Sequence, residues 1–110
     1  MDCIFCNIIN KAVPADVLYE DDKFVAFKDI KPSAPVHLLI VPKEHIASIN
    51  DLDKKHGAMI GDMFLLAKKL AKEQGVSDGY KLAFNTGRKG GQLVDHLHLH
   101  LMGGKKLPWA

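Results

Sequence analysis

The spacing of apolar positions changes along the chain and separates predicted helices from predicted strands. Apolar residues at positions 4, 5, 8 and 9 have the spacing of one helix face, which predicts a short helix near the N-terminus. From Asp53 the apolar positions recur every three or four residues, which predicts one long amphipathic helix that ends at Gly75. Short β-favouring runs predict five strands: Val17 to Glu20, Phe24 to Lys28, His37 to Val41, Tyr80 to Asn85 and His96 to Met102.

The order of these elements predicts an α+β domain. Asp21 and Asp22 lie between the first two strands and favour a hairpin, and the long helix falls between the third and fourth strands. We therefore expect a five-stranded antiparallel sheet with one long helix and a short N-terminal helix. A chain of about 100–150 residues usually builds one core, so residues 1–110 are expected to form a single domain.

Composition narrows the class of protein. The chain is 47% hydrophobic, and its 15 Lys and Arg against 13 Asp and Glu give a formal charge of +2 without a long block of either sign. This balance gives no reason to expect a nucleic-acid partner. The apolar run Leu38 to Val41 is far shorter than the ~20 residues of a membrane span. Met1, Asp2 and Cys3 do not open a secretory signal, so we expect a cytoplasmic protein without a membrane partner.

Three of the six histidines alternate with leucines near the C-terminus. On a strand, His96, His98 and His100 would share one face, while the intervening leucines face the core. Neighbouring imidazoles would lie about 6–7 Å apart and the outer two roughly 13 Å apart, so one ion cannot easily reach all three. Such a row can chelate a metal through one pair, or supply a nucleophile and a proton donor. The plainer interpretation is an exposed polar face, but a row of three histidines with no other polar residue type weighs against it.

The segment from Asn85 to Gln92 is rich in glycine and precedes the histidine row. Glycines allow positive φ angles and a close approach of ligand to backbone, and successive N–H groups can bind an anion. On its own the segment is better explained as a hairpin connection. Its position beside the histidines favours phosphate binding.

Cys3 and Cys6 form the only Cys-x-x-Cys pair. A redox pair is expected after a strand and at the start of a helix, and no strand precedes this motif. Half of a zinc site is the better interpretation, although two small buried thiols without a metal remain an alternative. Two further ligands would come from the histidines; His56, between Lys55 and Gly57, is expected to be exposed, and spacing does not choose among the others.

The motif His96-Leu97-His98-Leu99-His100-Leu101 resembles that of the histidine triad (HIT) superfamily. Further motifs in register resemble its Hint branch: Phe27 to Ile30, Ala34 to Lys43, Asn85 to Gly87, Gly90 to Gln92 and Gly103-Gly104. The resemblance covers nearly the whole chain. It implies the HIT-like fold, a homodimer, and hydrolysis or transfer at the α-phosphate of a nucleotide, most often a purine nucleoside phosphoramidate.

The resemblance also assigns site residues. His98 matches the nucleophile that becomes nucleotidylated, His100 matches the residue that contacts the phosphate and assists protonation of the leaving group, and His37 matches a supporting histidine. Asp29 matches the acidic residue that binds the ribose. The remaining residues implied in binding an AMP-like purine nucleotide are Phe5, Ile8, Phe27 and Ile30 around the base and Asn85, Gly91 and Gln92 near the phosphate. No catalytic metal is implied.

The same resemblance implies a structural zinc ion, because many bacterial members carry a Cys-x-x-Cys pair, a Pro-Lys-x-His sequence and the first triad histidine as ligands. The matching positions are Cys3, Cys6, His45 and His96. Dinucleoside polyphosphate hydrolysis, a nucleotide-binding protein with vestigial catalysis, and a metalloenzyme site on the histidine row remain alternatives.

Two departures from the animal Hint pattern affect specificity. Leu93 replaces a serine that contacts phosphate, and Asp95 replaces a tyrosine. The short tail Lys105 to Ala110 also lies in a region that shapes substrate preference in that branch.

Overall fold

The computed structural model describes residues 3–109. Met1 and Asp2, on which the prediction about a secretory signal depends, lie outside the described residues, as does Ala110 at the end of the tail.

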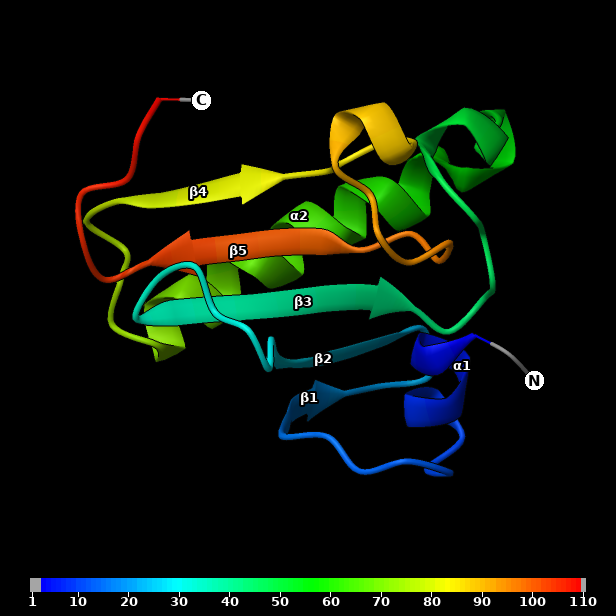
Figure 1. The fold of residues 1–110 in the computed structure, drawn as a ribbon, viewed down its shortest axis with the longest axis horizontal. Helices are drawn as coiled ribbons and strands as arrows, with labels where there is room; N and C mark the ends of the chain where they lie inside the picture. Colours follow the sequence, from blue (N-terminus) through cyan, green and yellow to red (C-terminus); the bar gives the residue numbers. More distant parts are fainter. Residues whose placement is uncertain (1–2, 110) are drawn as a thin grey trace.

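The described chain forms one five-stranded antiparallel sheet with the strand order β1-β2-β3-β5-β4 (Figure 1). The strands are β1 (Val17–Glu20), β2 (Phe24–Lys28), β3 (Val36–Pro42), β4 (Tyr80–Ala83) and β5 (Leu99–Gly103). The helices are α1 (Ile4–Ile9) and α2 (Gly57–Glu73), with single 3₁₀ turns at Ile49–Asp51, Lys54–His56 and Arg88–Gly90. The predicted α+β architecture is confirmed, including the hairpin of β1 and β2 and the place of α2 between β3 and β4.

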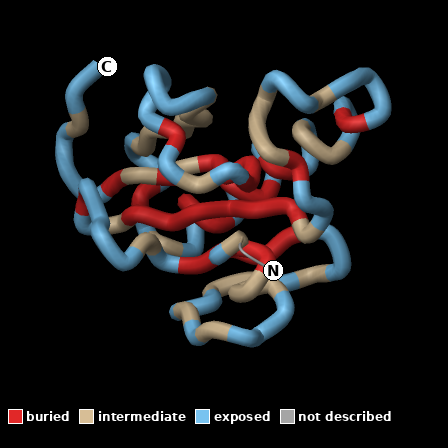
Figure 2. The backbone as a smooth tube through the Cα atoms, turned by 45° about the vertical axis from the view of Figure 1, so that its right-hand side comes forward, coloured by how far each residue is buried: buried red, intermediate tan, exposed pale blue. Residues whose placement is uncertain are grey.

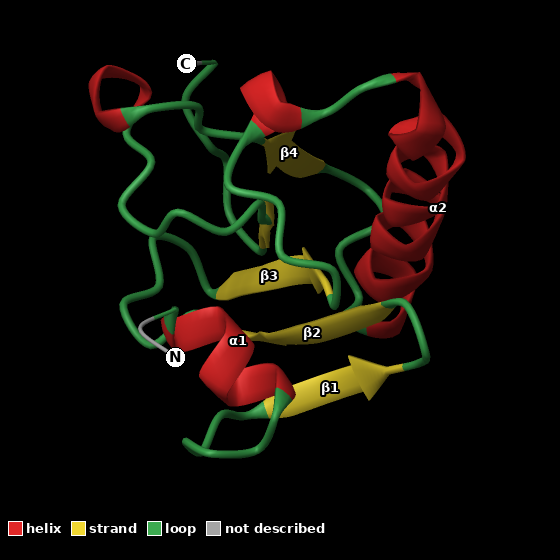
Figure 3. Ribbon diagram, turned by 90° about the vertical axis from the view of Figure 1, so that its right-hand side faces the viewer, coloured by secondary structure: helices red, strands yellow, loops and turns green. Residues whose placement is uncertain are grey.

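The two helices lie on opposite sides of the sheet (Figure 3). Alternate residues of β3 separate the two faces: Leu38 and Ile40 pack with α2, whereas Leu39 and Val41 pack with Phe5 of α1. The larger core lies under α2 and includes Leu97, Leu99 and Leu101, all nearly inaccessible to solvent. Figure 2 shows the central part of the backbone as buried and the loops as mostly exposed. The predicted leucine face is therefore confirmed, and the histidines lie on the α1 side.

Strand β5 begins at Leu99, later than the sequence predicts, so His96 and His98 precede it. The side chains of these two histidines form hydrogen bonds to backbone carbonyl groups. The Nε2–H of His96 donates to the carbonyl of Pro42 at 2.8 Å, and the Nδ1–H of His98 donates to the carbonyl of His96 at 2.7 Å. The backbone N–H of Leu97 turns to the carbonyl of Ile46 instead. Strand β4 likewise ends at Ala83 and not at Asn85.

The prediction that His56 is exposed is wrong. Its ring is buried, with 7% of the residue exposed, and accepts a hydrogen bond from the backbone N–H of Asp53 at Nδ1. Asp53 and His56 form a capping box at the 3₁₀ turn before α2. This turn also explains why α2 begins at Gly57, four residues after Asp53, while Gly75 with φ of 74° follows its end as predicted.

No helix among residues 3–109 combines the length and the apolar character needed to cross a membrane.

Candidate active site and metal centre

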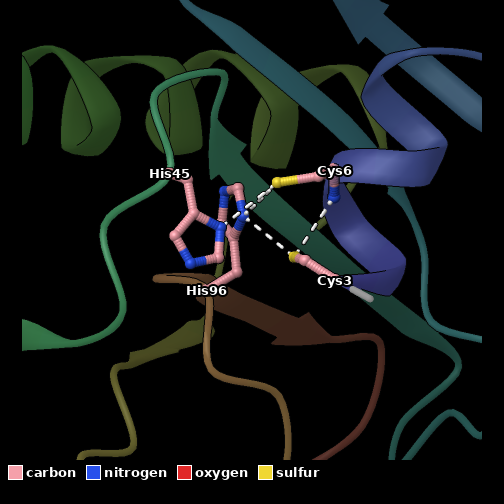
Figure 4. Close-up of side chains that lie close together, drawn as sticks. All are labelled: Cys3, Cys6, His45 and His96. Carbon is pink, nitrogen blue, oxygen red and sulfur yellow. Dashed lines mark hydrogen bonds between the residues drawn. The ribbon is translucent and has the colours of Figure 1, made fainter. Parts of the chain in front are cut away.

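Four cysteine and histidine side chains converge where α1 meets the end of β3 (Figure 4). They are Cys3, Cys6, His45 and His96, and their donor atoms all lie within 4.8 Å of one another. The Nδ1 atom of His96 lies 3.4 Å from the sulfur of Cys3 and 3.5 Å from that of Cys6. The Nδ1 atom of His45 lies 3.2 Å from the sulfur of Cys6. The structure thus brings together the predicted metal ligands from three separate parts of the chain.

The hydrogen bond of His96 to Pro42 orients its ring for metal binding. A carbonyl oxygen only accepts, so Nε2 of His96 carries the proton and the lone pair of the neutral ring is on Nδ1, which faces the two sulfurs. A backbone carbonyl on the distal nitrogen is the usual outer-shell partner of a ligating histidine. Burial lowers the pKa of His96 and keeps the ring in this neutral form.

The donor set fits zinc. Bonds of about 2.3 Å to sulfur and 2.0 Å to nitrogen in a tetrahedron place a sulfur and a nitrogen roughly 3.5 Å apart, close to the observed separations. Burial raises the pKa of the Cys6 thiol to about 11, and the neighbouring Cys3 adds to this shift. Two thiolates at this half-buried site therefore need a cation, and a coordinated metal deprotonates such thiols.

The ring of His98 is held in the tautomer opposite to that of His96. Its Nδ1–H is committed to the carbonyl of His96, which leaves the lone pair of the neutral ring on Nε2. The ring of Phe5 packs against it edge-on at 5.1 Å, and burial lowers the pKa of His98. His98 is thus held as a neutral imidazole whose free lone pair is available for nucleophilic attack.

His37 and His100 form a directed hydrogen-bond chain. The backbone N–H of Ser33 donates to Nδ1 of His37 at 2.9 Å, so the proton of the neutral ring is on Nε2. That Nε2–H donates to Nδ1 of His100 at 2.9 Å. His100 must then carry its own proton on Nε2, and this N–H is available as a donor to a ligand.

The surroundings keep this chain uncharged. Burial lowers the pKa of His100 to about 4, and the nearby His98 and His37 add to the effect. Burial also lowers the pKa of His37, although Asp29, whose carboxylate lies 3.5 Å from its Nε2, opposes the shift. An anion that entered the site would meet neutral N–H donors rather than a pair of cations.

Asp29, His37 and His100 also have donor atoms close enough to hold a metal ion, but their hydrogen bonds oppose it. The atom of His37 that faces the other two groups is Nε2, which carries the proton because Ser33 occupies Nδ1. A metal at Nε2 would require the opposite tautomer, and the Ser33 N–H would lose its acceptor. This arrangement weighs against a metal ion held by Asp29, His37 and His100.

A cavity of about 490 Å³ opens beside these histidines. Its lining includes nine of the predicted residues: Phe5, Ile8, Phe27, Asp29, Ile30, His37, Gly91, His98 and His100. The apolar members offer a surface for a base, and the carboxylate of Asp29 offers an acceptor for sugar hydroxyls. The volume of this cavity and its mostly apolar lining are typical of a site for a small molecule.

Asn85 and Gln92 do not line this cavity. The amide of Asn85 donates to the carbonyl of Gly90 at 2.9 Å. Gln92 is 2% exposed; its Nε2 donates to the carbonyls of Ala47 and Val94, and its Oε1 accepts from the N–H of Gly87. Both side chains shape the glycine-rich loop.

Two features of the site were missed in the sequence. The backbone N–H of Ser33 sets the tautomer of His37, and the carbonyl of Pro42 sets that of His96. The residue types Ser and Pro do not indicate that these positions orient a histidine ring, since the hydrogen-bonding group belongs to the main chain. Leu93, which was noted only as a departure from a pattern, lines the cavity with 81% of the residue exposed.

Comparisons with known proteins agree with this architecture. Residues 2–108 match the family model described as "Scavenger mRNA decapping enzyme C-term binding". A HIT-like protein of Synechococcus elongatus is 46% identical over 108 residues, covering 98% of this chain and 95% of the relative. This chain belongs to the HIT family.

Solved HIT structures extend the comparison to the fold. A HIT family hydrolase from Legionella pneumophila is 48% identical and superimposes with a TM-score of 0.96, covering 98% of this chain and 97% of that one. The HIT-like fold expected from the sequence is therefore confirmed. A relative in Escherichia coli K12, named purine nucleoside phosphoramidase, is 45% identical over 107 residues, which are 96% of this chain and 90% of that protein. These comparisons place the chain among the HIT family hydrolases.

One neighbour bears on the metal centre. A zinc-bound histidine triad family protein from Mycobacterium smegmatis is 32% identical, with a TM-score of 0.84 over 99% of this HIT chain and 81% of that one. Zinc is thus found in at least one protein of the same fold.

Proposed function

We propose that this protein hydrolyses purine nucleoside phosphoramidates through a nucleotidyl-histidine intermediate on His98. The observation that carries the proposal is the commitment of the Nδ1–H of His98 to the His96 carbonyl, which leaves a neutral Nε2 beside the cavity. The name of the Escherichia coli relative supports the substrate class.

The reaction divides into two displacements. Nε2 of His98 attacks phosphorus, the phosphorus–nitrogen bond breaks, and the leaving nitrogen takes a proton from solvent to depart as a neutral amine. The Nε2–H of His100 forms a hydrogen bond to the phosphoryl group or the leaving nitrogen, while His37 holds the ring of His100 from behind. Water then attacks phosphorus, breaks the bond from phosphorus to Nε2 of His98 and returns a proton to solvent, which releases the nucleoside monophosphate and restores neutral His98.

The nucleoside would occupy the apolar part of the cavity. Phe5 and Phe27 pack edge-to-face at 5.4 Å and offer a preformed wall for a purine, with Ile8 and Ile30 at its sides. Asp29 would bind the ribose hydroxyls, and its position is held by the backbone N–H of Lys31, which donates to its Oδ1 at 2.9 Å. Gly91, with φ of 90°, would allow the phosphate to approach the backbone. Asn85 and Gln92 would act indirectly, through the shape of this loop.

The metal centre is proposed to hold one structural zinc ion through Cys3, Cys6, His45 and His96, as its donor geometry favours. When bound, zinc supplies a crosslink between α1 and the sheet. Homodimer formation and the absence of a nucleic-acid partner stay predictions.

The test is turnover of an adenosine phosphoramidate by the wild-type protein and by His98→Ala. We expect kcat/KM to fall by about a thousandfold or more, because the covalent route is lost. Mass spectrometry of rapidly quenched wild-type protein should show a nucleotidyl adduct that is absent from the variant. Equal turnover by His98→Ala would overturn the proposal.

The same assay separates the alternatives. A higher kcat/KM for a dinucleoside polyphosphate would favour that substrate class, since the ratio of kcat/KM values defines preference. Binding of AMP in calorimetry without any adduct would indicate a binding protein with vestigial catalysis.

A further inference from the structure

Leu93 is an exposed apolar side chain on a firmly held loop. On one side of it, the buried amide of Gln92 makes three hydrogen bonds to backbone groups. On the other side, Asp95 accepts two hydrogen bonds from the guanidinium of Arg88, at 2.8 and 3.1 Å. Arg88 also donates to the carbonyl of Gln92. The hydrogen bonds of the neighbouring residues therefore hold the loop in a conformation in which Leu93 is exposed.

This side chain lies between two hollows of the surface. The first is the cavity that contains the catalytic histidines, and the second is a hollow of about 390 Å³ next to the metal ligands. Both are lined by Ile4, Leu93 and Val94, while the second also includes Cys3, His45, Arg88 and Asp95. The wall shared by the two hollows is entirely apolar. Ile4 is also 44% exposed, so the patch is open to a ligand.

The charges of the second hollow oppose an anionic occupant. The only guanidinium in its lining, that of Arg88, is already paired with Asp95, and each partner shifts the pKa of the other to stabilise the charged form. An anionic leaving group would find no free arginine there among the described residues. An uncharged apolar group would instead cover Leu93 and Ile4 and remove their surface from water.

We propose that Leu93, with Ile4 and Val94, forms a subsite for the apolar part of an amine leaving group. The inference rests on the proposed phosphoramidase function. With the nucleoside against Phe5 and Phe27 and phosphorus beside His98, the substituent that departs extends away from the nucleophile, across the shared wall into the second hollow. Leu93 is thus a specificity-determining residue.

The test compares two adenosine phosphoramidates whose amines have similar basicity, 2-phenylethylamine and 2-methoxyethylamine. We expect the wild-type kcat/KM to be roughly fivefold or more higher for the phenyl compound, because its ring buries apolar surface on Leu93. Leu93→Asn, similar in size but polar, should bring this ratio close to one. Leu93→Met should retain the preference, which a merely structural role would not require.

Leu65→Asn is the matched control. Leu65 is another exposed leucine, on α2, and lines neither of the two hollows. This variant should keep both the wild-type ratio and the wild-type affinity for AMP. A wild-type ratio near one, or a ratio that Leu93→Asn leaves unchanged, would overturn the subsite.

A second measurement separates failure of the subsite from failure of the proposed reaction. Calorimetry with His98→Ala measures the affinity of the same two compounds without turnover. If the wild-type protein cleaves neither compound but His98→Ala binds the phenyl compound more tightly, and Leu93→Asn in that background removes the difference, the subsite is supported and the reaction is not. Equal affinities for the two compounds would reject the subsite whatever the turnover.

Discussion

The two histidine clusters are adjacent in the fold and differ in the direction of their hydrogen bonds. In the proposed metal centre, His96 donates its Nε2–H to Pro42 and its Nδ1 lone pair faces two sulfurs. In the proposed catalytic chain, His37 accepts a hydrogen bond from Ser33 and donates its Nε2–H to His100. Converging lone pairs bind a cation, whereas alternating donors and acceptors orient a proton. Backbone groups that hold the rings of His37, His96 and His98 thus decide what otherwise similar residues do.

The clusters also meet directly. The carbonyl of His96, whose ring belongs to the metal centre, accepts the Nδ1–H of His98. Phe5 lies between Cys3 and Cys6 in the sequence and contacts the rings of both His96 and His98. The proposed metal centre therefore supports Phe5 and His98, the proposed nucleophile, in the wall of the neighbouring cavity.

The largest expected effect comes from breaking the metal centre. Cys3→Ser combined with Cys6→Ser should reduce zinc from one ion per chain to none and lower Tm by about 10 °C or more, because the metal binds only the folded chain. Metal analysis and calorimetry measure both. A chelator should lower the Tm of the wild-type protein and leave that of the double variant unchanged. A full zinc content in the variant would contradict the assigned ligands.

Breaking the catalytic chain should leave the metal centre intact. His37→Ala removes the N–H that orients His100 and should lower kcat/KM by about 10- to 100-fold without loss of zinc. His37→Gln can place an amide N–H near the same position and should recover part of the loss. Wild-type activity in His37→Ala would show that the chain has no role in turnover.

His56 belongs to neither cluster and is a control for both. His56→Ala removes one half of the capping box and should lower the free energy of unfolding by about 1 kcal/mol. Denaturant unfolding measures this change, while zinc content and kcat/KM should stay at wild-type values. A loss of zinc or of kcat/KM in His56→Ala would mean that reduced stability explains the effects of the other histidine variants.

The pH dependence should be the smallest effect. The pKa of His100 lies at about 4, below the ordinary value near 6.5, so its ring stays neutral at pH 5.5. Its protonation should change kcat/KM less than about twofold between pH 7.5 and 5.5. The unfolded chain takes up this proton near pH 6.5, so the contribution of His100 to stability is present above that pH and is lost toward pH 4. A steep fall in kcat/KM near pH 6.5 would contradict a neutral chain with a lowered pKa.

Periodicity predicted the sheet, the long helix and the leucine face, since side-chain alternation and helical spacing are local properties of the sequence. The gathering of Cys3, Cys6, His45 and His96 could be predicted only through resemblance, because spacing alone left several histidines open. The orientation of the rings could not be predicted, since it depends on main-chain groups of Ser33 and Pro42, whose residue types carry no signal of this role. His56 was mispredicted because its neighbours Lys55 and Gly57 are polar or small, while its capping bond is invisible in composition.

Hydrogen bonds to backbone groups set the ring tautomers of His37, His96 and His98, and His37 in turn sets that of His100. Nitrogen NMR of the zinc-loaded protein with ¹⁵N-labelled histidine reports which ring nitrogen carries the proton. We expect a proton on Nε2 of His37, His96 and His100 and on Nδ1 of His98 at pH 7. A proton on Nδ1 of His37, or on Nε2 of His98, would contradict it.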